Sequence, residues 1–96
     1  MKSKKVLNTI RSSLPRLQEL GVSSVAVFGS ATRDELKPDS DVDILIDFEG
    51  AATFDKYMEA KFLLEKILKR PVDLVTPRAL KPRMRPSIER EAIYVT

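Results

Sequence analysis

The 96-residue sequence contains neither cysteine nor histidine. Without cysteine, the chain has no disulfide and no zinc–thiolate site. Without histidine, it has no Ser-His-Asp triad, no histidine-bound zinc and no histidine-dependent ribonuclease mechanism. Any general base must therefore be a carboxylate or a lysine, and any bound metal must be a hard cation held by oxygen.

Long apolar runs are also missing. No stretch approaches the roughly 18 apolar residues that a membrane span requires, and no apolar segment follows the basic start MKSKK. We therefore expect a soluble, cytoplasmic protein. The length predicts one domain over residues 1–96. So short a chain has no room for a separate substrate domain, so a large substrate would meet an open cleft.

Charge is distributed unevenly along the chain, although the net charge is only +3. Residues 34–50 hold seven acidic residues and one basic residue, whereas residues 66–90 hold eight basic residues and two acidic residues. The acidic segment suits cations. The basic segment suits phosphates or an acidic partner.

Hydrophobic periodicity predicts alternating helices and strands, hence an α/β (α+β) fold with a small mixed sheet flanked by helices. Pro15 interrupts the first helical pattern, so we expect two short helices there, the second entered at Ser13. The segment after Pro77 carries further prolines and is predicted to be helical only in part. The predicted elements are helices over 6–20, strands over 22–28 and 41–48, a helix over 53–69, a strand over 72–75 and a partial helix over 80–93.

The strongest chemical signal is Gly29-Ser30, directly after the first strand, followed by Ser40-Asp41-Val42-Asp43. Glycine lets the backbone approach a phosphate closely, and the carboxyl end of a strand is where α/β sheets place ligands. Residues i and i+2 of a strand share a face, so Asp41 and Asp43 point together. Two adjacent carboxylates repel unless a cation such as Mg²⁺ neutralises them.

Asp73 is a third candidate, because it stands alone in the apolar strand Val72–Val75. As a metal ligand or general base it would help to activate a hydroxyl nucleophile. Each feature alone has a structural explanation: a turn, a solvated acidic pair, an exposed acid. The spacing Asp39-x-Asp41-x-Asp43 also suggests a calcium loop, but the glycine and glutamate that such a loop needs are Ile44 and Gly50 here.

The ordered combination Phe28-Gly29-Ser30, Ser40-Asp41-Val42-Asp43-Ile44 and Val72-Asp73-Leu74 resembles the DNA polymerase beta-like nucleotidyltransferase superfamily, in its minimal nucleotidyltransferase (MNT) branch. The resemblance implies the polymerase beta-like core. It implies nucleotide binding by Gly29, Ser30, Arg33 and Ser40, with Mg²⁺ as cofactor and ATP as substrate. It implies metal binding and catalysis by Asp41, Asp43 and Asp73. Asp34 departs from the pattern, since the family often has glycine near this position.

Proteins of this branch are typically antitoxins paired with a HEPN-domain ribonuclease toxin. The resemblance therefore implies transfer of AMP from ATP to a tyrosine hydroxyl of the toxin, as a homo-oligomer or as a hetero-oligomer with the toxin. The alternative is an antitoxin that inhibits by binding alone. A third reading makes the basic segment 78–90 a nucleic-acid contact, but it lacks interleaved aromatic residues and any DNA-reading motif.

Overall fold

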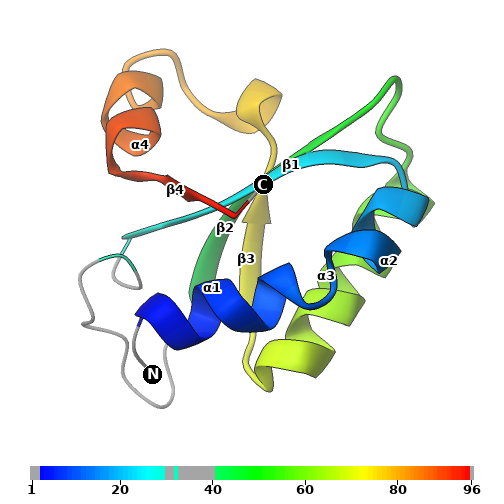
Figure 1. Ribbon diagram of the computed structural model, residues 1–96. Coiled ribbons are helices and arrows are strands. Elements are labelled where there is room, and N and C mark those ends of the chain that lie inside the picture. Colours follow the sequence, from blue (N-terminus) through cyan, green and yellow to red (C-terminus); the bar gives the residue numbers. More distant parts are fainter. Residues whose placement is uncertain (1–2, 30–31, 33–40, 96) are drawn as a thin grey trace.

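The computed structural model describes residues 3–29, 32 and 41–95, which form one mixed four-stranded sheet with helices on both sides (Figure 1). The strand order is β3-β2-β1-β4, with β1 antiparallel to β2 and β4, and β2 parallel to β3. The predicted fold class is thereby confirmed. In chain order the elements are α1 (Ser3–Arg11), α2 (Leu14–Glu19), β1 (Val22–Phe28), β2 (Val42–Phe48), α3 (Phe54–Leu68), β3 (Val72–Val75), η2 (Pro77–Ala79), α4 (Arg85–Glu91) and β4 (Ile93–Tyr94).

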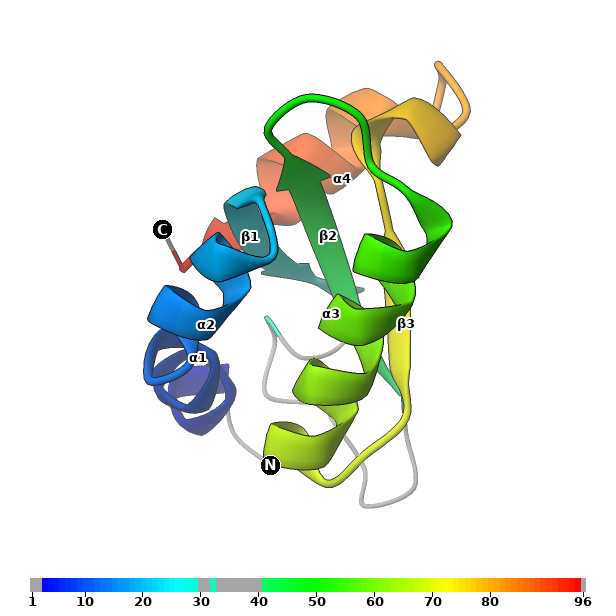
Figure 2. The ribbon, with the colours of Figure 1, turned by 90° about the vertical axis from the view of Figure 1, so that its right-hand side faces the viewer.

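The sheet divides the molecule into two sides. Helices α1, α2 and α3 cover one side, α4 lies on the other, and the 3₁₀ turn η2 follows the carboxyl end of β3 (Figures 1 and 2). Alternate strand residues point toward α1–α3, as the period of two requires. Together with the inner helix residues they make one hydrophobic core, whose buried members are Val6, Ile10, Leu17, Val22, Val25, Val27, Val42, Ile44, Ile46, Phe48, Ala60, Leu64, Leu68, Val72, Leu74 and Val95.

The two N-terminal helices form where the sequence predicts them, and Pro15 lies in the first turn of α2, where no intrahelical donor is lost. Helix α2 is entered at Ser13, as predicted, but without the side-chain bond of a typical N-cap. The Ser13 side chain is buried instead. Backbone bonds join the helices here, because the Ser13 N–H donates to Ile10 O at 2.9 Å. No helix in the described part of the chain is long and apolar enough to cross a membrane.

Helix α3 confirms the predicted helix over 53–69, with both predicted ends acting as caps. The Thr53 hydroxyl accepts a hydrogen bond from the Lys56 N–H at 3.2 Å, which satisfies one otherwise unpaired donor of the first turn. Lys69 ends the helix in the left-handed conformation with φ 57°. A carboxylate oxygen of Glu65 then accepts from the Val72 N–H at 3.0 Å, which ties α3 to the start of β3.

The C-terminal segment contains the predicted partial helix over 80–93, but this helix is short. Helix α4 begins only at Arg85, with Pro86 in its first turn, and it ends at Glu91. Ile93 and Tyr94 form β4, an edge strand that the sequence analysis missed. Two residues are too few to display the period of a strand, so only pairing with β1 defines this element. Val95 continues the contact, because its N–H donates to Val25 O at 2.8 Å.

Candidate active site

Asp43 and Asp73 lie side by side on neighbouring strands. They are register partners in the parallel pair β2–β3, and both point to the side of the sheet that carries α4. The register is fixed at the start of both strands, because the Val42 N–H donates to Pro71 O at 3.0 Å. Asp41 lies exposed just before β2. The predicted grouping of these three acids at one end of the sheet is thus what the topology produces.

The site lies where the ends of strands of opposite direction meet. Since β1 runs antiparallel to β2, the carboxyl end of β1 meets the amino ends of β2 and β3. The rule that ligands bind at the carboxyl ends of parallel strands therefore explains Gly29 but not Asp43 or Asp73. The acids reach the site because their strands start there.

Gly29 lies so close to the Asp43 carboxylate that an added side chain would force this carboxylate to move. It has a φ of +73°, and an added Cβ would lie 2.3 Å from an Asp43 carboxylate oxygen. Phe28, the residue before it, is the register partner of Asp43. The Thr32 hydroxyl donates to Gly29 O at 2.8 Å and closes the turn. The glycine is therefore required by backbone conformation and by the space that the carboxylate occupies.

The electrostatic environment of Asp43 favours its protonated form. Burial raises the pKa of its carboxyl, and the negative charges of Asp73 and Asp41 raise it further. A side-chain hydrogen bond to Asp73 and the charge of Glu91 act in the same direction. Carboxylates that lie this close together repel one another, and a bound cation would neutralise that repulsion.

Glu91 is a fourth acidic residue near the site, and the sequence analysis assigned it no role. It ends α4 and is half-buried. The strand β4 follows α4 and pairs with β1, and the charge of Glu91 acts on Asp43. Only the pairing of β4 reveals this position, because Glu91 is 48 residues from Asp43 in the sequence.

Three residues predicted to bind the nucleotide, Ser30, Arg33 and Ser40, lie outside the described residues, as does Asp34. Their assignment stays a prediction. Of the predicted nucleotide-binding residues, the described part of the chain contains Gly29, which lies against Asp43.

The described acidic residues fit a Mg²⁺ ion that is bound jointly by the protein and by the phosphates of the substrate. They do not fit an ion enclosed by protein ligands alone. No three acidic side chains among them converge into a ready-made metal site. Mg²⁺ is commonly held by one or two carboxylates, with the remaining positions filled by substrate phosphates and water. The in-register pair Asp43 and Asp73 provides such a partial set, with Asp41 exposed beside it.

Metal-free protein should become less stable as the pH rises through the raised pKa of Asp43. The folded state keeps this proton above the ordinary value of 3.8, so it binds more protons than the unfolded state in that window. Asp43→Asn should therefore stabilise the protein in EDTA at pH 7, by roughly 1 kcal/mol or less because solvent screens the partly exposed carboxyl. Urea unfolding at pH 4 and pH 7 measures this. Equal destabilisation of the variant at both pH values would contradict it.

Comparison with known proteins identifies the family of the chain. The family model described as a nucleotidyltransferase domain matches residues 7–95. The chain therefore belongs to the nucleotidyltransferase domain family. More particularly, it is a minimal nucleotidyltransferase homologous to protein adenylyltransferase MntA of Thermococcus cleftensis, with 44% identity over 78 residues, 81% of this chain and 79% of that protein. A candidate protein adenylyltransferase of Methanocaldococcus jannaschii is 37% identical over 86 residues, 88% of this chain and 91% of that protein.

Solved structures give the same result for the fold. A candidate minimal nucleotidyltransferase superposes with a TM-score of 0.83 at 38% identity, covering 97% of this chain and 95% of that one. An MNT antitoxin in complex with a tri-AMPylated HEPN toxin of Shewanella oneidensis gives a TM-score of 0.66 at 16% identity, covering 94% and 71%. A toxin–antitoxin complex with AMP-PNP gives 0.71 at 18%, covering 90% and 72%. The last two, at low identity, show the shared fold.

Proposed function

We propose that this enzyme transfers AMP from ATP to a tyrosine hydroxyl of a HEPN-domain toxin and thereby neutralises the toxin. The observation that carries the proposal is the contact between Gly29 and Asp43, with Asp73 in register beside it. This arrangement leaves space for a phosphate to approach the backbone and provides carboxylates that can bind a cation. Homology to a protein adenylyltransferase supports the reaction, and the similarity in fold to an MNT antitoxin bound to an AMPylated HEPN toxin supports the partner.

The residues of the site have different proposed roles. Asp41, Asp43 and Asp73 would hold Mg²⁺, which supplies positive charge to the phosphates and lowers the pKa of the attacking hydroxyl. Gly29 has no side chain, so it leaves room for the phosphates and does not displace the Asp43 carboxylate. Ser30, Arg33 and Ser40 would complete nucleotide binding as donors to phosphate oxygens.

In the transfer step, the tyrosine oxygen attacks the α-phosphorus of ATP, and the bond from that phosphorus to the bridging oxygen breaks. Pyrophosphate leaves, and AMP remains on the tyrosine. The hydroxyl proton must be taken up, because tyrosine has an ordinary pKa of about 10. Asp73 is exposed at the edge of the site and is the carboxylate we assign to accept that proton.

The substrate is expected to be a docked protein rather than a small molecule. The described residues form a single sheet with helices on both sides, and they include no separate domain for binding a substrate. A tyrosine on another protein can reach such a site directly.

The test is incorporation of labelled AMP from ATP into a HEPN protein encoded beside this gene, with and without Mg²⁺. We expect label on one or more tyrosines of the HEPN protein, only when Mg²⁺ is present, together with loss of its ribonuclease activity. If the HEPN protein is bound and inhibited but carries no label, inhibition comes from binding alone. That outcome would refute the proposed transfer.

A further inference from the structure

The side of the sheet that carries the acidic site also carries the most basic segment of the chain. Residues 78–90 contain five basic residues and one acidic residue, and all five basic side chains are exposed. They belong to η2, which follows the carboxyl end of β3, to α4, which lies on the opposite side of the sheet from α1–α3, and to the turn between these elements (Figure 1). The five are Arg78, Lys81, Arg83, Arg85 and Arg90.

Helix α4 connects this basic surface to the acidic site. Arg85 begins the helix beside Asp47 and Arg78, with which it lines a hollow of about 580 Å³. Glu91 ends the helix, and its charge acts on Asp43. A helix of seven residues spans only about 10 Å. A protein docked along α4 therefore extends from the Asp47 end of β2 toward the end of that strand that holds Asp43.

Around Arg78 the surface is hollowed and partly apolar. Arg78 lines three neighbouring hollows, one of which, about 750 Å³ in volume, is bordered by Phe54 and Tyr57. Phe54 is 76% exposed and Met84, on the turn before α4, is 49% exposed. Arginine, aromatic and methionine side chains around hollows are the composition enriched in protein interfaces. Segment 78–90 itself contains no aromatic residue on which nucleic-acid bases could stack.

We infer that the surface formed by residues 78–90 and centred on Arg78 docks an acidic face of the protein substrate and so delivers its hydroxyl to Asp43 and Asp73. This inference rests on the proposed transfer to a protein. The positive charge of this surface favours a partner that has acidic residues near the tyrosine to be modified. The same partner would be repelled by the carboxylates of the site, so attraction by segment 78–90 sets the orientation in which it approaches.

The double charge reversal Arg78→Glu with Arg83→Glu tests this surface. Arg85 is left in place because it pairs with Glu89 at 3.4 Å on α4. We expect the KM for the HEPN protein to rise about tenfold or more at roughly 0.1 M salt, with kcat and the KM for ATP little changed. Raising the salt should weaken docking of the wild type more than docking of the variant.

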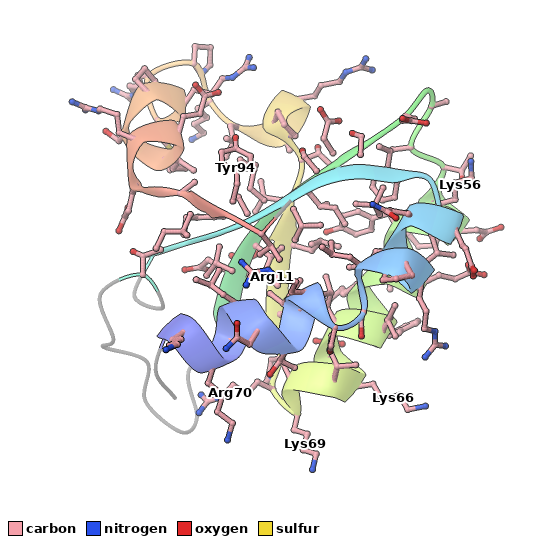
Figure 3. All side chains as sticks on the ribbon, in the orientation of Figure 1. Arg11, Lys56, Lys66, Lys69, Arg70 and Tyr94 are labelled. Carbon is pink, nitrogen blue, oxygen red and sulfur yellow. The ribbon has the colours of Figure 1, made fainter. Side chains whose placement is uncertain are left out.

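The matched control is Lys56→Glu with Lys66→Glu, which changes the net charge equally on α3. Figure 3 shows both lysines at α3, away from α4. Circular dichroism and thermal melts establish that both variants fold. If the two variants raise KM equally, net charge rather than this surface is responsible and the inference fails. If the arginine variant loses affinity for an RNA duplex but not for the HEPN protein, the surface binds nucleic acid and the inference also fails.

Binding of fluorescent poly-L-glutamate, measured without ATP or Mg²⁺, keeps the inference separate from the proposed transfer. The arginine variant should bind this acidic polypeptide at least about fivefold more weakly than the lysine variant. Equal binding by the two variants would overturn the docking surface even if AMP transfer is found. Weaker binding by the arginine variant would support the surface even if no transfer to the HEPN protein occurs.

Discussion

Asp43→Asn is expected to reduce AMP transfer by at least about 10³-fold while leaving the fold intact. Asp43 lies at the centre of the site, against Gly29 and in register with Asp73. Losing a carboxylate that binds the catalytic cation removes several kcal/mol of transition-state stabilisation, and about 4 kcal/mol corresponds to this factor. Single-turnover assays with labelled ATP measure it. Combining Asp43→Asn with Asp41→Asn should add little, because the two residues act on the same ion.

The matched control is Asp47→Asn, on the same strand and on the same side of the sheet. Asp47 is exposed and lies four residues from Asp43, at the far end of β2. Its carboxylate accepts a hydrogen bond from the Phe48 N–H at 2.9 Å, which an asparagine oxygen can also accept. This variant should keep transfer activity within about threefold of wild type, since it loses charge but no ligand of the site. Similar losses from both variants would refute the assignment of Asp43.

Gly29→Ala is expected to lower kcat/KM by about 10²-fold or more, although only one methyl group is added. The new Cβ would require the Asp43 carboxylate to move, since they would be 2.3 Å apart. A displacement of about 1 Å at reacting groups can cost about 10²-fold in rate. The φ of +73° adds strain of about 1–2 kcal/mol, so thermal unfolding should also occur at a lower temperature.

Gly50→Ala separates the two causes. Gly50 has nearly the same backbone angle, φ +72°, but an added Cβ would meet nothing within 4 Å. Both variants should therefore lose similar stability, whereas only Gly29→Ala should lose activity. A comparable loss of activity in both would mean that backbone strain, and not contact with Asp43, accounts for the effect.

Much of this structure could be predicted from the sequence because its elements are long enough to show their period. The helix over 53–69 carries its own cap residues, and the strand Val72–Val75 isolates Asp73 between apolar neighbours. Elements without such signals were predicted poorly. β4 has only two residues, and Ser13 looks like a helix cap although it is buried without a capping bond.

The sequence by itself determined the chemistry. The absence of cysteine and histidine left carboxylates and hard cations, and the order of Gly29, Asp41, Asp43 and Asp73 resembles the pattern of nucleotidyltransferases. These conclusions depend on residue types and short spacings, which a linear chain displays directly.

Only the tertiary structure decided how these groups meet. It made β1 antiparallel to β2, so that the acids approach Gly29 from the starts of their strands. It brought Glu91 close enough for its charge to act on Asp43 and placed α4 on the side of the sheet where Asp43 points. Strand order and pairing depend on contacts between residues far apart in the chain, and such contacts cannot be inferred from local periodicity.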